Sequence, residues 1–120
     1  MIVSLGRPVG IDIEQPLPDK AQIPSDMYVH PNDRFHPATA ETDISRFFTA
    51  WTLKEAIAKC DGEGLGMPFS EIRLEPGKDD TYRGFYDCKT WYADHWILDD
   101  GTHLAYAGEA PCSPLHIFVI

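Results

Sequence analysis

The segment FFTAWTLKEAIAKC, residues 47–60, decides the fold because apolar side chains recur along it with the period of a helix. The apolar positions are Phe47, Ala50, Trp51, Leu53, Ile57 and Ala58. They describe a helix that is buried over much of its girth. Capping residues precede it within residues 40–43, and three glycines within residues 61–66 predict its end. The sequence therefore predicts one long, largely buried helix.

Three charged side chains interrupt this apolar segment. Glu55 and Lys59 lie four positions apart and share a helix face with Trp51, whereas Lys54 points about 100° away. One interpretation is an ordinary surface ion pair between Glu55 and Lys59. The other is a functional edge on an otherwise buried helix.

The segment VGIDIE, residues 9–14, alternates in the manner of a strand. We expect its β-branched residues, among them Ile11 and Ile13, to face the core, so that Asp12 and Glu14 project together on the other side, about 6.6 Å apart. If the helix packs against this strand, Glu55 becomes a third carboxylate nearby. Three such carboxylates suit a hard cation such as Mg²⁺, although acidic residues on an edge strand are more often a solvated face.

The remaining chain predicts a loop-rich connection followed by a β-rich half. Residues 15–42 contain five prolines. In this connection Tyr28, His30, Asp33 and His36 could suggest a second metal site, but two histidines six positions apart in a proline-rich loop are more often surface residues. The strand candidates after the helix are Ser70–Leu74, Arg83–Cys88, Tyr92–Leu98, His103–Ala107 and Leu115–Ile120, with a hairpin turn at Asp99–Gly101. This order predicts an α+β fold in which an antiparallel sheet packs against one long helix.

Composition sets the broad class of the protein. The 120 residues, 13.5 kDa and 43% hydrophobic content predict a single domain over residues 1–120. The net charge of −9 argues against nucleic acid or an anionic membrane as a partner. With no apolar run of membrane-spanning length and no secretory signal at the start, we expect a cytoplasmic protein.

Together, GIDIE (residues 10–14) and WTLKEAIAK (residues 51–59) resemble the two signatures of the 4′-phosphopantetheinyl transferase superfamily. These are a G-[IV]-D-[IVL]-E strand and a W-[ST]-x-K-E-[AS]-x-x-K helix, and the glycine-rich turn that follows also fits. The tryptophan in the helix motif resembles the larger, surfactin-synthetase-activating class rather than the short holo-[acyl-carrier-protein] synthase class.

The resemblance implies an activity and a role for each matching residue. Asp12, Glu14 and Glu55 match carboxylates that hold Mg²⁺ on the pyrophosphate of coenzyme A. Lys59 matches a lysine near the transferred phosphate, and Lys54 matches one that contacts the coenzyme. The implied reaction moves the phosphopantetheine arm to a serine of an acyl or peptidyl carrier protein, with Glu55 as general base and Lys59 stabilising the leaving group.

The resemblance also leaves the assembly open. Members of the larger class have two similar halves with the active site between them, and this chain resembles the second half. A second copy could complete the site in a homo-oligomer, the sequence could be a fragment, or the protein could have lost activity. A non-catalytic half-domain that serves as a binding subunit is the alternative function, and a metal-dependent phosphate-ester hydrolase is a third.

Overall fold

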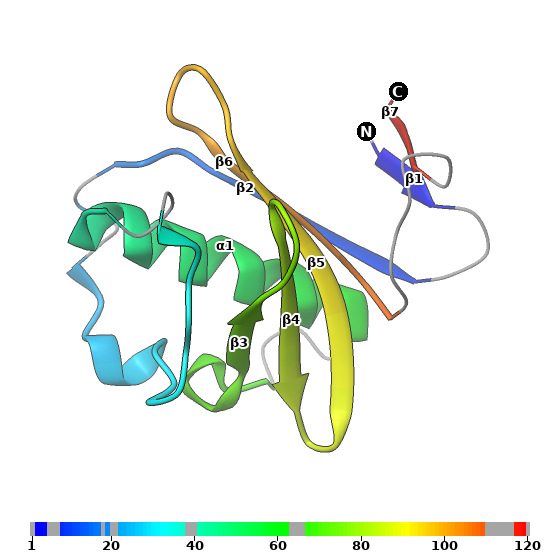
Figure 1. Cartoon of the computed structure of the whole chain (residues 1–120), viewed down its shortest axis with the longest axis horizontal. Helices are drawn as coiled ribbons and strands as arrows, with labels where there is room; N and C mark the ends of the chain where they lie inside the picture. The colour runs from blue at the N-terminus through cyan, green and yellow to red at the C-terminus, as the bar shows by residue number, and fades with distance from the viewer. Residues whose placement is uncertain are drawn as a thin grey trace.

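The computed structural model describes residues 2–4, 8–17, 19, 22–37, 41–62, 67–109 and 117–119 of the chain. One long helix lies across a sheet, and a separate pair of short strands contains both ends of the described chain (Figure 1). In chain order the elements are β1 Ile2–Ser4, β2 Val9–Glu14, η2 Ser25–Met27, α1 Asp43–Asp61, η5 Phe69–Glu71, β3 Arg73–Pro76, β4 Thr81–Tyr86, β5 Lys89–Ile97, β6 His103–Gly108 and β7 Ile117–Val119.

The main sheet has five strands in the order β2-β6-β5-β4-β3, and every neighbouring pair is antiparallel. β2 comes early in the chain but pairs with β6, so that Asp12 lies opposite Ala105. The smaller sheet pairs β1 with β7. The predicted α+β fold, with an antiparallel sheet packed against one long helix, is confirmed.

Local chemistry sets both ends of α1 as the sequence predicts. The Thr42 hydroxyl accepts a hydrogen bond from the Ser45 amide at 3.0 Å, which caps the first turn. At the other end Gly62 takes the left-handed conformation, with φ of 81°, and its amide bonds the Ala58 carbonyl. The other two glycines of this predicted turn lie outside the described residues. Among the helices that the structure describes, none is both long enough and apolar enough to cross a membrane.

The core lies between α1 and the sheet. It contains Ala50, Leu53, Ala56, Ile57, Ala58 and Cys60 from α1, Ile72, Leu74, Tyr82, Trp91, Ala93, Ala105 and Ala107 from the sheet side, and Met67. Trp91 is only 1% exposed and is the largest fully buried side chain. The helix is therefore held by a broad apolar layer, as its sequence period predicts.

Two of the strand predictions need local changes. β3 begins at Arg73 instead of Ser70, because Phe69–Glu71 forms a 3₁₀ turn. Cys88 belongs to a two-residue hairpin turn, in which Asp87 and Cys88 both have positive φ, of 50° and 62°. The predicted turn at Asp99–Gly101 is confirmed, and β7 falls inside the last predicted strand, whose other residues lie outside the described part.

The orientation of β2 differs from the prediction. Asp12 is 5% exposed and faces α1, whereas Ile13 is 62% exposed. The reason is Gly10, where an added Cβ would overlap the Ala56 carbonyl oxygen and lie 2.5 Å from the Cys60 amide nitrogen. The face with Gly10, Asp12 and Glu14 therefore packs on the helix, and the isoleucine face is turned away from it. The prediction that Ile11 and Ile13 face the core was wrong.

We expect Gly10→Ala to destabilise the fold strongly. The added methyl would enter space occupied by the backbone of α1, so the helix must move, and the free energy of unfolding should fall by about 3 kcal/mol. Gly84→Ala is the matched control, since its methyl would meet the flexible Cδ1 end of Ile57 at 2.5 Å. Chemical denaturation measures both variants. Equal losses would contradict the proposed backbone contact.

Candidate functional site

The two motif segments meet where the ammonium of Lys59 contacts the carboxylate of Asp12. Lys59 Nζ lies 2.7 Å from Asp12 Oδ1 and 3.3 Å from the Ile11 carbonyl oxygen. The Lys59 side chain is half exposed, whereas that of Asp12 is 6% exposed. This ion pair thus joins the end of α1 to the middle of β2 at the edge of the core.

Glu14 and Glu55 extend this cluster toward the first half of α1. Glu14 is partly buried, two residues along β2 from Asp12, and its charge acts on both Asp12 and Glu55. Glu55 is partly buried on α1, one turn before Lys59. The prediction that Asp12 and Glu14 share a face is confirmed, and that face is the one toward Glu55.

Burial and like charge raise the acid pKa values in this cluster. Burial raises the pKa of Asp12 from 3.8 to about 6, the hydrogen bond from Lys59 opposes this shift, and Glu14 adds to it. Burial is also the main cause that raises the pKa of Glu55, while Lys59 lowers it and Glu14 raises it further. The hydrogen bond to Asp12 raises the pKa of Lys59, so the ammonium stays charged at neutral pH.

A pocket of about 440 Å³ opens beside Glu55. Glu14, Asp19 and Glu55 bring carboxylates to it, and the remaining lining residues are Ile23, Phe47, Phe48 and Trp51. Phe47 and Phe48 are at most 2% exposed, so the aromatic side is firmly packed. The cluster therefore adjoins a space with an apolar side and an acidic side.

The donor set fits a hard cation, although the side chains do not converge on a single point. Among the described residues, no three His, Cys, Asp or Glu side chains are gathered to hold a metal ion, and Lys59 occupies one oxygen of Asp12. The other oxygen, Asp12 Oδ2, is buried without a hydrogen-bond partner. An unpaired buried oxygen beside a second carboxylate is stabilised by a cation, which is the chemistry that Mg²⁺ supplies.

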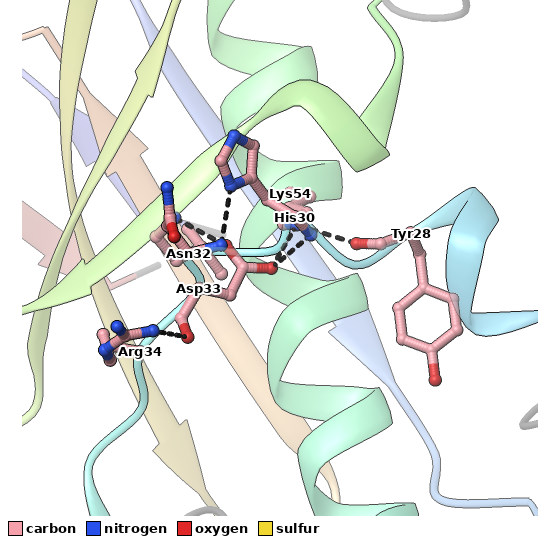
Figure 2. A network of polar contacts seen from close by, with 7 residues as sticks. Tyr28, His30, Asn32, Asp33, Arg34 and Lys54 are labelled. Carbon is pink, nitrogen blue, oxygen red and sulfur yellow. Dashed lines mark hydrogen bonds and ion pairs between the residues drawn. The ribbon is translucent and has the colours of Figure 1, made fainter.

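Lys54 lies apart from this cluster and is fully buried. Its ammonium donates to the Tyr28 carbonyl oxygen and to Asp33 Oδ2, both at 2.7 Å (Figure 2). The side chain of Lys54 is 0% exposed and that of Asp33 is 2% exposed. Lys54 thus holds together two parts of the fold, and its predicted contact with coenzyme A stays a prediction.

Comparison with known proteins identifies the family. Residues 8–112 match the family model described as the 4′-phosphopantetheinyl transferase superfamily. The chain belongs to this superfamily. The match includes both β2 and α1, and so both segments of the phosphopantetheinyl transferase signature.

One curated transferase is similar to part of the chain. The 4′-phosphopantetheinyl transferase gsp of Aneurinibacillus migulanus is 29% identical over 77 residues, which cover 62% of this chain and 32% of that protein. The chain thus spans about a third of the length of this relative.

Sequence reasoning missed Asp33 as a partner of Lys54. A signal for the burial of Lys54 was present, because position 54 lies four residues after Ala50 and three before Ile57, within the apolar stripe of the helix. A lysine on a buried stripe requires an acid partner. Nothing in the local pattern of the proline-rich loop singled out Asp33 for that role.

The raised pKa of Asp12 predicts a stability that falls as pH rises. The folded pKa of about 6 exceeds the unfolded 3.8, so between about pH 4 and pH 6 the folded state binds more protons, and its free energy of unfolding decreases through this window. We expect Asp12→Asn to reduce this slope, while Glu55 retains a contribution of the same sign. Denaturation at several pH values measures the slope.

Asp100→Asn is the control, because its shift has the opposite sign. Hydrogen bonds from Thr102 lower the pKa of Asp100, so its stabilisation is present above the unfolded value and is lost as pH falls below it. Asp100→Asn should therefore leave the decrease between about pH 4 and pH 6 intact. An Asp12→Asn variant with an unchanged slope would contradict the burial of this carboxylate.

Proposed function

We propose that this chain transfers the 4′-phosphopantetheine group of coenzyme A to a serine of an acyl or peptidyl carrier protein, with Mg²⁺ as cofactor. The observation that carries the proposal is the 2.7 Å contact between Lys59 and Asp12, which joins the two signature segments at one point. Membership of the superfamily supports the type of reaction.

The proposed step forms one bond and breaks one bond. The serine oxygen forms a bond to the phosphorus that carries the pantetheine arm, while the bond from this phosphorus to the bridging pyrophosphate oxygen breaks. The serine proton passes to Glu55, and adenosine 3′,5′-bisphosphate leaves. Burial raises the pKa of Glu55, which supports the role of base, because a more basic carboxylate accepts a proton more readily.

Lys59 supplies positive charge where the leaving oxygen becomes negative. Its pKa is raised, so the ammonium remains protonated, and its half-exposed side chain can reach an incoming phosphate. Lys54, by contrast, is occupied inside the fold, so we assign the phosphate role to Lys59 alone. Of the two motif lysines, Lys59 therefore takes part in the proposed reaction, and Lys54 stabilises the fold.

We further propose that Asp12, Glu14 and Glu55 hold the Mg²⁺ ion. When bound, Mg²⁺ neutralises the pyrophosphate and polarises the bond that breaks. The partnerless Asp12 Oδ2 and the mutual repulsion of the carboxylates support this assignment, since a cation relieves both. A cation on Asp12 also competes with Lys59 for the same carboxylate.

A transfer assay tests the function. The purified chain is incubated with fluorescent coenzyme A, Mg²⁺ and a panel of apo carrier proteins, and label on the carrier is measured. We expect labelling that chelation with EDTA abolishes and Mg²⁺ restores. Glu55→Gln and Lys59→Met should each lower kcat/KM by about 100-fold or more.

Glu71→Gln is the matched control for the loss of an acidic side chain. Glu71 is exposed on η5, so this variant should keep the wild-type rate. In parallel, NMR titration should show that Mg²⁺ lowers the pKa of Asp12. Metal binding without labelling of any carrier would instead favour a non-catalytic binding domain, and release of free phosphopantetheine without an acceptor would indicate a hydrolase.

We also propose that the active form is a homo-oligomer, because the chain matches only 32% of a curated transferase, and a second copy would supply the rest of a two-part site. Light scattering coupled to size exclusion should therefore give at least twice the chain mass of 13.5 kDa. A monomeric chain that still labels carriers would contradict this part of the proposal without affecting the transfer reaction.

A further inference from the structure

Asp33 and Lys54 form a hydrogen-bonded ion pair whose side chains are both buried. Asp33 Oδ2 accepts from Lys54 Nζ at 2.7 Å and from the His30 amide at 2.9 Å. Asp33 Oδ1 accepts from the Leu74 amide at 2.7 Å. One carboxylate thus binds the loop of residues 28–36, helix α1 and strand β3 (Figure 2).

Further contacts fix the same loop to the same two elements. Lys54 Nζ binds the Tyr28 carbonyl oxygen at 2.7 Å, and the Tyr28 ring packs edge-on against Phe47 with centroids 4.8 Å apart. On the β3 side, the Arg34 amide bonds the Leu74 carbonyl at 3.0 Å. Contacts at Tyr28 and at Arg34 therefore hold the two ends of the loop, and Lys54 contacts the loop at Tyr28 and Asp33.

This loop belongs to the connection that forms one side of the pocket beside Glu55. The connection leaves β2 after Glu14 and contributes Asp19 and Ile23 to the pocket before it reaches Tyr28. Phe47 of α1, on which Tyr28 packs, also lines the pocket. The Asp33–Lys54 pair thus fixes the end of a segment whose earlier residues border the site.

A gain in stability is a weak explanation for a buried ion pair such as Asp33–Lys54. Desolvating two charges is costly, and apolar residues of similar volume often serve stability equally well. A buried pair instead specifies geometry, because its hydrogen bonds are satisfied in only one arrangement. Here that arrangement sets where the connection lies relative to Glu55, the residue after Lys54.

We propose that Asp33 is a positioning residue, which acts through Lys54 to hold the loop of residues 28–36, and with it the pocket-lining residues Asp19 and Ile23, as a fixed wall of the pocket beside Glu55. Lys54 then contributes to the reaction through this wall and the orientation of α1, without touching coenzyme A. The inference rests on the proposed transferase function for its kinetic effect. Its structural effect can be measured independently.

The test compares Asp33→Asn, Lys54→Met and the double variant with Arg46→Met. Arg46 is the control because it forms an exposed ion pair with Asp43 on the same helix, and it lies outside the site. Hydrogen exchange of the His30 and Leu74 amides, and the ¹⁹F resonance of labelled Trp51, report the wall without reference to activity.

We expect faster exchange of both amides and a shifted Trp51 resonance in the two single variants, with none of these changes in Arg46→Met. In the transfer assay kcat/KM should fall by about 100-fold, mainly through KM, since a displaced wall misplaces the substrate. The two single losses should not add in the double variant, because both remove the same pair.

Two outcomes would overturn the proposal. If Lys54→Met lowers kcat/KM while Asp33→Asn does not, then Lys54 contacts the substrate directly. If the folded variants keep wild-type exchange and the wild-type Trp51 resonance, the pair does not hold the wall. Should a single variant fail to fold, the double variant serves, since it leaves no unpaired buried charge. An inactive wild-type chain would refute the transferase function. The hydrogen-exchange and ¹⁹F data would still show whether the Asp33–Lys54 pair holds the wall of the pocket.

Discussion

The close approach of β2 to the backbone of α1 at Gly10 is the constraint on which the site depends. Without a side chain at this position, the strand lies directly against Ala56 and Cys60. The next inward residue, Asp12, then reaches Lys59, and the one after it, Glu14, acts on Glu55. From Asp12 to Glu14 the partner on α1 moves back from Lys59 to Glu55, which is about one turn of the helix. One glycine thus brings the acidic strand within reach of the charged helix.

Elements with a strong local signal could be predicted from the sequence, whereas the side of the strand that faces the helix could not. The period of α1, its Thr42 cap and the Gly62 turn are all local features. The alternation of β2 correctly indicated that Asp12 and Glu14 share a face. Hydrophobicity then suggested the wrong side, because the tight backbone contact at Gly10 outweighs the burial of the isoleucines. Steric contact between distant segments is not visible in a local pattern.

The buried lysine shows a different limit of prediction. Position 54 lies on the apolar stripe, so its burial follows from the helix period. Its partner Asp33 lies 21 residues earlier in a loop without periodicity, where several acidic residues have equal claim from sequence alone. A motif lysine can therefore be assigned a coenzyme-binding role from its spacing, while its surroundings show that it stabilises the fold. Only the three-dimensional partner separates the two roles.

The acidic charge around the pocket makes binding of the proposed coenzyme depend on the proposed metal ion. Glu14, Asp19 and Glu55 all line the pocket, and Asp12 lies beside Glu14, so an incoming pyrophosphate meets a strongly acidic region. Lys59 offsets part of this charge but is already paired with Asp12. Phosphate binding next to several carboxylates is unfavourable unless a cation lies between them. The proposed coenzyme and the proposed cation would therefore require one another at this site, and a chain that bound the coenzyme equally well without metal would need a different phosphate site.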